Sequence, residues 1–320
     1  MAPLPPEAVC VIRGNMTEVH CLLFHIISNN EILYAGTENG MVYVWNLKVH
    51  NYNFFYYIDV ACLSLHLFDD YLITQDKSCL LKVWKNTNND FNCMYTKEFN
   101  NVSFCKIDSF KTDIIYLVIP QSESLVTVCH FEFFSINIKE SIKHPDKNLK
   151  LGEVMHLKIF RSNIKLCVAV VYENGMLIIW DLLEISIIYS DKMTIDTPMA
   201  FDFDPVNFQG ICGSNEKNIV IFKLDENFNL IKRKIIEITN AGTSVLRIRP
   251  DRKIVVAGCW DGHLRIFSWK TCKLLAVLNC HRASILDVRF SESTIKKWDS
   301  KHLLAAGGSD NRISFWRIYE

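Results

Sequence analysis

Short apolar runs recur along the whole chain, each followed by a polar turn and then by alternating apolar and polar residues. The unit is clearest in ILYAGTENGMVYVW, which ends at Trp45, and in IVVAGCWDGHLRIF, which ends at Phe267. Alternation with a period of two is typical of half-buried β-strands. Asn-Gly and Asp-Gly pairs are typical of tight turns between such strands. Each unit therefore predicts a β-hairpin.

The last residue of each hairpin marks a repeat. These anchor residues are, in chain order, Trp45, Trp84, Cys129, Trp180, Phe222, Phe267 and Trp316, and neighbouring anchors lie 39 to 51 residues apart. That spacing matches the ~40 to 45 residues of a WD repeat better than any helical repeat. Between anchors there is room for two further strands, such as KLLAVLN and SILDVRF after Phe267. The sequence predicts an all-β, seven-bladed WD-repeat β-propeller that occupies residues 1–320 as a single domain, and whether the degenerate third unit is a complete blade stays open.

The last unit has only three strands of its own, which we expect over residues 285–290, 302–306 and 312–318. A sheet that ended there would leave an unpaired edge, which soluble proteins avoid. The apolar segment AVCVIR, residues 8–13, precedes the first strand of unit one, expected at 19–24, and has no partner there. We therefore expect residues 8–13 to become the outer strand of the C-terminal blade and to close the propeller.

Composition says more about the class of partner than about the fold. Lys plus Arg equal Asp plus Glu at 35 each, and 49% of the residues are hydrophobic, which is ample for a core. Nucleic-acid or anionic-membrane binding normally needs a basic excess. No run approaches the ~20 apolar residues of a membrane span, and the N-terminus lacks the pattern of a signal peptide. We expect a cytoplasmic and nuclear protein that binds neither nucleic acid nor membrane.

Residues for catalysis or metal binding do not gather in the sequence. The twelve cysteines form no C-x-x-C pair and most lie in apolar runs, so we expect buried thiols rather than disulfides or a zinc site. His20 and His25 are five residues apart on or near one strand and therefore face opposite sides. No H-E-x-x-H, G-x-S-x-G or P-loop pattern is present. We expect no enzyme, no metal and no cofactor.

Two polar residues suggest a buried network in the last unit. Asp310 and His281 resemble the Asp and His that hydrogen-bond inside a WD repeat, and such a contact stabilises by about 1 to 3 kcal/mol. Ala306 stands where a Ser or Thr would complete the network, so we expect it to be partial. We interpret His281 as structural rather than catalytic. The aromatic anchors assigned to packing are Trp45, Trp84, Trp180 and Trp316.

Trp260 is the strongest candidate for partner binding. It stands beside Asp261, a candidate for the same contact, in a predicted turn where other units carry polar residues. An exposed aromatic side chain in such a turn is a candidate binding hot spot. The alternative is that Trp260 packs over the neighbouring blade, and the sequence does not choose between them.

Two further sites are candidates for partner contacts. A basic run is expected in the loop between the first and second strands of the same unit, at the end of the blade opposite Trp260. It contains Arg247, Arg249, Arg252 and Lys253. Such clusters are most often simply solvated, and a partner site there is the alternative reading. Trp298, in the loop SESTIKKWDSKH, is the third candidate.

The chain resembles WD-repeat propellers throughout. Over its last third it resembles the family of G-protein beta-subunit-like protein 1. The segments that carry this resemblance are RIRPDRKIVVAGCWDGHLRIFSWKTCKLLAVLNCH and LLAAGGSDNRISFWRIY, with VIRGNMTEVHCLLF and PMAFDFDPVNFQGICGSNEKNIVIFKLD before them. That family is similar to the fungal subunit associated with the ASTRA assembly.

The resemblance implies a non-catalytic adaptor that acts with the cochaperone complex that matures phosphatidylinositol-3-kinase-related kinases. It implies proteins as partners and a monomer within a larger complex. A gamma subunit pairs with the long N-terminal helix of a true G-protein beta subunit. Only about seven residues, three of them proline, precede the first predicted strand, so no heptad fits and we expect no gamma partner.

Two other functions remain as alternatives. Substrate receptors of cullin ubiquitin ligases commonly carry W-D-x-R at the end of a third strand, whereas residues 180–183 read WDLL, with Leu in place of Arg. A reader of modified peptides would need an acidic or aromatic cage in the central channel. The sequence does not show whether Trp260 and Trp298 approach such a channel.

Overall fold

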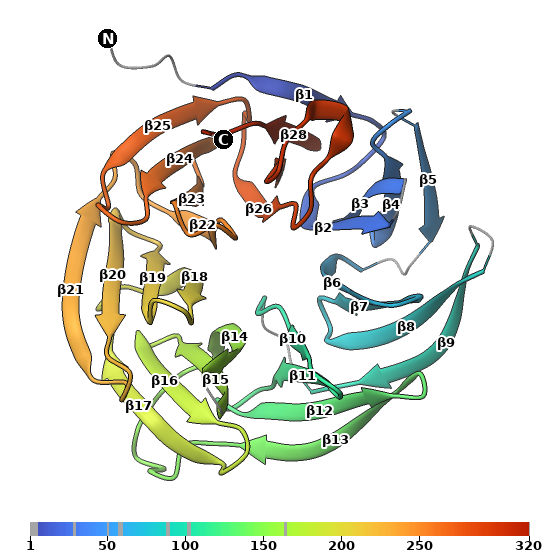
Figure 1. The fold of residues 1–320 in the computed structure, drawn as a ribbon. Coiled ribbons are helices and arrows are strands. Elements are labelled where there is room, and N and C mark those ends of the chain that lie inside the picture. The colour runs from blue at the N-terminus through green and yellow to red at the C-terminus, as the bar shows by residue number, and fades with distance from the viewer. Residues whose placement is uncertain are drawn as a thin grey trace. The chain divides into compact units, whose positions relative to one another are not determined.

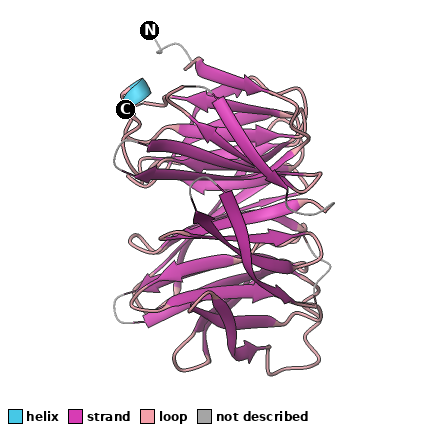
Figure 2. Cartoon of the chain, turned by 90° about the vertical axis from the view of Figure 1, so that its right-hand side faces the viewer, coloured by secondary structure: helices cyan, strands magenta, loops and turns pink. Residues whose placement is uncertain are grey.

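Nearly all regular structure in the protein is β-strand. The computed structural model describes residues 6–27, 30–49, 51–56, 60–87, 90–100, 104–162 and 165–319. These residues contain 28 strands and one 3-10 turn, η1 (Lys296–Trp298), the single cyan element in Figure 2. The strands form seven four-stranded sheets, and the fold is a seven-bladed β-propeller, as predicted.

The chain divides into two compact units, residues 1–67 with 240–320, and residues 68–239. Three sheets belong wholly to the first unit (Figure 1). Their strands are β2 (Val19–Ile27), β3 (Asn30–Thr37), β4 (Met41–Asn46) and β5 (Asn51–Tyr56); β22 (Thr243–Ile248), β23 (Ile254–Cys259), β24 (His263–Ser268) and β25 (Leu274–Asn279); and β26 (Ile285–Phe290), β27 (Leu304–Gly308), β28 (Arg312–Trp316) and β1 (Ala8–Arg13).

The second unit contains three complete sheets. Their strands are β10 (Asp108–Lys111), β11 (Ile115–Pro120), β12 (Val126–Glu132) and β13 (Ser135–Ile142); β14 (Val154–Ser162), β15 (Lys165–Tyr172), β16 (Met176–Asp181) and β17 (Ser186–Lys192); and β18 (Pro198–Asp204), β19 (Gln209–Ser214), β20 (Asn218–Leu224) and β21 (Leu230–Glu237). The remaining sheet consists of β6 (Cys62–Phe68), β7 (Tyr71–Asp76), β8 (Leu80–Thr87) and β9 (Asp90–Glu98). That the seven sheets form one domain stays a prediction.

The N-terminal strand completes the C-terminal sheet. β1 pairs antiparallel with β28, from Ala8 opposite Trp316 to Arg13 opposite Arg312, so the predicted closure is confirmed. Four predicted strand limits were wrong: β2 runs to Ile27 rather than residue 24, β27 spans Leu304–Gly308 rather than residues 302–306, and β28 ends at Trp316 rather than residue 318. β27 begins two residues after His302, whose ring nitrogen instead contacts the carbonyl of Ser291 in the preceding loop. β28 ends before Ile318, whose carbonyl accepts a hydrogen bond from an arginine rather than joining the sheet ladder.

The third sheet, β10 to β13, is complete although its anchor residue is a cysteine. In other sheets the pairing of the third and fourth strands shifts by one residue immediately before Trp84, Trp180 and Phe267. The pairing of β12 with β13 shifts immediately before Cys129 in the same way. Such a bulge turns a strand and re-aims its side chains. Cys129 therefore occupies the anchor position, and this answers the question that its sequence left open.

Tight turns between second and third strands have the backbone that their sequences predict. Gly175 and Gly262 both have positive φ, 87° and 78°, a conformation that glycine adopts without cost. Each also lies against another segment, since a β-carbon on Gly262 would stand 2.7 Å from the carbonyl oxygen of His281. A larger residue at either position would strain the turn and displace its neighbour.

Apolar side chains fill the space between sheets inside each unit. In the first unit Leu22 and Trp45 pack with Phe315. In the second unit Phe160, Phe203 and Phe222 form part of a single buried cluster. Burial of one such side chain stabilises the fold by about 1.5 to 3 kcal/mol, which explains why aromatic and branched residues recur at these positions.

Candidate protein-interaction surfaces

A four-residue polar network ties the C-terminal sheet together. The Nδ1 of His281 lies 2.9 Å from the Oδ1 of Asp310, and its Nε2 lies 2.8 Å from the hydroxyl of Ser314. The indole of Trp316 donates to the same hydroxyl at 2.9 Å. Because a carboxylate only accepts, the ring proton lies on Nδ1, and Ser314 donates to Nε2. His281 is buried, so the network lies inside the blade.

The prediction that Ala306 leaves this network partial was wrong. Ala306 lies directly opposite Ser314 in the pairing of β27 with β28. Residues opposite one another in an antiparallel pair place their side chains on the same face of the sheet. The hydroxyl is therefore supplied from the third strand instead of the second. In the sheet of β6 to β9 the second strand supplies it, since Trp84 donates to Thr74 at 2.9 Å.

Trp260 lies in the turn between β23 and β24 and is 43% exposed. Its ring covers Gly242, in the loop that leads into β22, and a β-carbon on Gly242 would overlap that ring. Its backbone N–H donates to the carbonyl of Gly242 at 3.1 Å. The contact is thus with the loop of its own sheet. The rest of the indole faces solvent, and the Trp260 backbone is held by its hydrogen bond to Gly242.

Asp261, beside Trp260, is engaged within the sheet. Arg265 donates to both carboxylate oxygens, at 3.0 and 2.7 Å, and Asn240 donates to one of them at 2.8 Å. Burial alone would raise the pKa of Asp261, but the hydrogen bonds from Arg265 and Asn240 outweigh it and hold that pKa well below its usual range. Asp261 therefore braces the turn that presents Trp260, and a direct contact between Asp261 and a partner stays a prediction.

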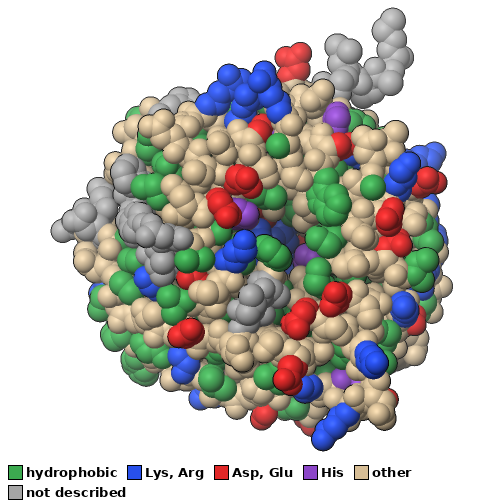
Figure 3. Space-filling view, turned by 180° about the vertical axis from the view of Figure 1, so that it is seen from behind, with side chains coloured by type: hydrophobic (Ala, Val, Ile, Leu, Met, Phe, Trp, Pro, Cys, Tyr) green, Lys and Arg blue, Asp and Glu red, His purple; other side chains and the backbone are tan. Residues whose placement is uncertain are grey.

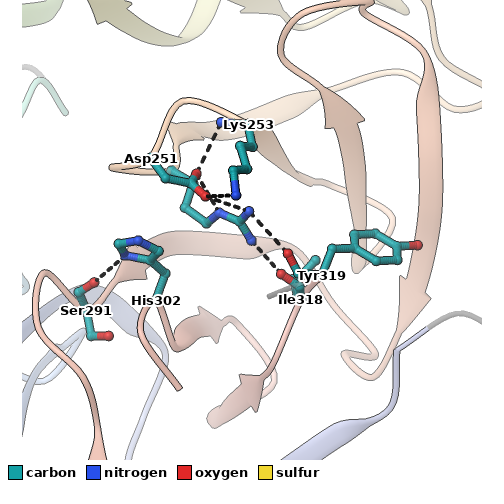
Figure 4. A network of polar contacts seen from close by, with 7 residues as sticks. Asp251, Lys253, Ser291, His302, Ile318 and Tyr319 are labelled. Carbon is teal, nitrogen blue, oxygen red and sulfur yellow. Dashed lines mark hydrogen bonds and ion pairs between the residues drawn. The ribbon is translucent and has the colours of Figure 1, made fainter. Parts of the chain in front are cut away.

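The basic run at the other end of β23 is only partly a surface feature. Arg249 is 2% exposed and donates to both carboxylate oxygens of Asp251, at 2.8 and 2.9 Å. Its guanidinium also donates to the carbonyls of Ile318 and Tyr319 (Figure 4). The expectation of a solvated cluster was wrong for Arg249, which holds the segment after β28 against the loop before β23.

The other members of the basic run differ from Arg249. Arg247 donates to the carbonyl of Val288 at 3.3 Å. Arg252 is exposed in a left-handed backbone conformation, and the Lys253 side chain is 73% exposed. Arg252 and Lys253 can therefore reach a partner, and that role stays a prediction.

Trp298 packs against the core. Its ring is stacked on Phe315 with 5.5 Å between centroids, and the ammonium of Lys297 lies over the Trp298 ring, 5.3 Å from a ring centroid. Lys297 also donates to the carbonyls of Leu47 and Lys48. The half-buried Trp298 therefore anchors the loop between β26 and β27 to β28 of its own sheet, and Lys297 ties the same loop to the segment after β4. Trp260 lies at the far end of its own blade, and the structure does not bring these two tryptophans to one site.

Two exposed features were missed by the sequence reasoning. The hairpin between β12 and β13 turns through Phe133 and Phe134, both at positive φ, and Phe133 is 88% exposed. Phe134 rests on Tyr71, with ring centroids 5.6 Å apart. The second feature is β21, whose first six residues are all exposed. Two consecutive phenylalanines where a tight turn was needed, and three consecutive cations in an outer strand, were the signals available in the sequence.

Neither a metal-ligand group nor a membrane-spanning helix is found among the described residues. They contain no group of three or more His, Cys, Asp and Glu side chains arranged to hold a metal ion. They also contain no helix that is long and apolar enough to cross a membrane. On the face drawn in Figure 3, basic side chains gather in one patch at the upper edge, and elsewhere acidic and basic side chains lie among one another and among hydrophobic ones.

The comparisons with known proteins agree with the repeat pattern. The profile of the WD domain, G-beta repeat, matches residues 237–268 and 272–317. The crystal structure of the Cps50 (Swd1) β-propeller domain from Myceliophteria thermophila superposes with a TM-score of 0.74 at 14% identity. That alignment covers 98% of this chain and all of the other, and it bears on the fold alone.

Relatives match over the whole length as well. The guanine nucleotide-binding protein subunit beta-like protein 1 of Mus musculus is 29% identical, over 99% of this chain and 98% of its own. ASTRA-associated protein 1 of Schizosaccharomyces pombe is 25% identical over 98% and 99%, and that of Verticillium alfalfae is 22% identical over 99% and 94%. The predicted resemblance is confirmed: this chain is a seven-bladed β-propeller with WD-repeat matches in its last third, and it is similar over its full length to beta-subunit-like protein 1 and to fungal ASTRA-associated proteins.

Proposed function

We propose that the protein is a non-catalytic adaptor that brings protein partners together during cochaperone-assisted maturation of phosphatidylinositol-3-kinase-related kinases. The observation that carries the proposal is the full-length similarity to proteins named as ASTRA-associated. A WD-repeat propeller is a rigid platform, and fold alone would not select this role because propellers serve many functions. The adaptor acts in the cytoplasm and nucleus as a monomer within a larger complex.

The turn that carries Trp260 is the contact we assign to a partner. Hot spots of protein interfaces are enriched in Trp and Arg and depend on a backbone that is already ordered. The ring rests on Gly242, and Asp261 is held by Arg265, so binding orders little that is not ordered already. Arg252 and Lys253 offer a second, charged contact at the other end of the sheet, where complementary charge speeds association more than it tightens binding.

Affinity purification of the tagged full-length chain, followed by mass spectrometry, tests the role. Recovery of the large kinases or of their cochaperone complex is the expected result. Recovery of cullin-ligase adaptors in their place would overturn the proposal and favour a substrate receptor. Recovery of neither, with modified peptides enriched instead, would favour a peptide reader.

Trp260→Ala tests the site separately from the role. We expect it to lower recovery of the same partners while the free energy of unfolding stays within about 1 kcal/mol of the parent, as for a surface change. Ile195→Ala is the matched control, because Ile195 is an 88% exposed apolar residue elsewhere on the chain. A large loss of stability in Trp260→Ala would show that Trp260 is a packing residue.

A further inference from the structure

The outer strand β21 is a sheet edge of unusual chemistry. It ends the sheet β18-β19-β20-β21, so within the described residues one of its two edges has no paired strand. Its sequence is LIKRKIIE, and every residue from Leu230 to Ile235 is exposed. Ile231 and Ile235 are 60% and 59% exposed. An exposed edge presents a row of backbone N–H and C=O groups to which another strand can add.

Charge separates β21 from the other outer strands. It carries three consecutive cations, Lys232, Arg233 and Lys234, against a single acid, Glu237. β25 reads LLAVLN without any charge, and β17 reads SIIYSDK with one acid and one base. Lysines on an edge strand discourage aggregation, and this can be their whole role. Three adjacent cations flanked by exposed isoleucines also select a partner, because they favour an anionic strand over any other.

The register shows which side chains share a face. Arg233 lies opposite Phe222 and Ile235 lies opposite Val220, so Arg233 and Ile235 are on one face. That face lies toward β17, because Arg233 donates to the carbonyl of Lys192 at 3.0 Å. Lys232 and Lys234 occupy the other face. An added strand would therefore meet Ile235, beside an Arg233 already bound to the carbonyl of Lys192, on one face and two lysines on the other.

We propose that β21 binds an extended protein segment in which acidic and apolar residues alternate, by adding it as a fifth strand to this sheet. Backbone hydrogen bonds to the edge supply affinity, and the side chains on each face supply specificity. The acidic residues lie over Lys232 and Lys234, and the apolar residues lie beside Ile235. This site is separate from Trp260 and does not depend on the kinase-maturation role.

Fluorescence anisotropy with a labelled peptide, EVEVEVE, and the full-length chain tests the proposal. We expect saturable binding that weakens as salt rises, because the lysines are exposed and their charges are screened. The charge-reversed peptide KVKVKVK should not bind. Equal binding of the two peptides, or no binding of EVEVEVE, would overturn the proposal and leave the lysines a purely protective role.

The variant Lys232→Glu with Lys234→Glu should lower the affinity for EVEVEVE about tenfold or more, which is about 1.4 kcal/mol. Lys139→Glu with Lys143→Glu makes the same change of charge on and beside the exposed strand β13 and should leave the affinity unchanged. Equal losses in the two variants would reduce the interaction to net charge. Unchanged affinity in the first variant would overturn the assignment to β21.

Hydrogen exchange of the unaltered protein gives an answer even where a variant fails to fold. With EVEVEVE bound, amides within residues 230–237 should exchange more slowly. A peptide N-methylated along one edge should retain binding, and one methylated along the other should lose it, because only one edge donates to β21. Protection confined to another sheet, or equal binding of both methylated peptides, would contradict strand addition.

Discussion

The C-terminal sheet and the third sheet reach similar backbone arrangements with different side chains. In the former, Trp316 is buried and is linked through Ser314 to His281. In the latter, Cys129 takes the anchor position, and burial raises its pKa to about 12, so it remains a thiol. The register shifts beside the anchor in both sheets. A blade thus requires the strand pattern and its register, whereas the polar network adds stability to a blade that already exists.

Removal of residues 1–13 should have the largest effect on this comparison. It deletes β1, exposes the edge of β28 and uncovers apolar side chains of the C-terminal sheet, while the third sheet keeps all four strands. We expect aggregation, because an open apolar edge pairs with other chains. Size-exclusion chromatography measures it, with a deletion of residues 1–5 as the control. A soluble and fully stable 14–320 chain would refute the closure.

Loss of the polar network should be the next largest effect. Ser314→Ala leaves His281 and the Trp316 indole without their shared partner inside the blade. We expect a loss of about 1 to 3 kcal/mol in the free energy of unfolding by urea, the cost of unpaired buried polar groups. Adding Ala306→Ser should restore part of it, since the two residues lie opposite one another. An unchanged stability in Ser314→Ala would show that the Ser314 hydroxyl contributes nothing to the network.

The turn of the third sheet should respond in the opposite direction. Phe133 has a φ of 48° and is 88% exposed, so its ring contributes little packing while its backbone is strained. Asn tolerates the left-handed region better than Phe. Phe133→Asn should therefore raise the free energy of unfolding by about 0.5 to 1 kcal/mol. Phe134→Asn should gain less, because it gives up the contact with Tyr71. A loss in Phe133→Asn would reveal packing that its exposure does not show.

Acidification should slightly lower the free energy of unfolding through His130 in the third sheet. Burial and the neighbouring Lys139 lower the pKa of His130, against a smaller opposite effect of Glu132. The folded state therefore favours the neutral ring, so its contribution is complete above the unfolded pKa of about 6.5 and declines as the pH falls below it. Urea unfolding at pH 7.5 and 5.5 measures the decline, and His130→Gln should reduce it.

Carboxyl groups change the free energy of unfolding at a lower pH than His130, so they do not mask the effect of His130. Asp181 and Asp251 have lowered pKa values, held down against burial by hydrogen bonds from Lys165 and Arg249. Their contributions are present above their unfolded pKa near 4 and are lost as the pH falls from there through their lower folded-state pKa values. Equal pH dependence of His130→Gln and the parent between pH 7.5 and 5.5 would place the effect elsewhere.

The candidate sites were only partly predictable from the sequence. Trp260 was identified because an aromatic residue interrupted a polar turn pattern, and it is indeed exposed. Arg249 was misjudged because, besides Asp251 two residues away, it binds the carbonyls of Ile318 and Tyr319, about 70 residues further along the chain. Trp298 looked like Trp260 in its polar loop, and only the stacking on Phe315 separates them. Contacts between distant segments leave no local pattern to read.

The sequence by itself determined the repeat, the number of blades and the pairing of residues 8–13 with the last blade. The physical reason is that alternation, turn residues and an unpaired edge are local or additive properties of the chain. Tertiary structure alone decided which polar side chains meet. It placed Ser314 rather than residue 306 on His281, buried Arg249, and left the cations of β21 on an open edge, because register and the approach of distant segments decide each of these contacts.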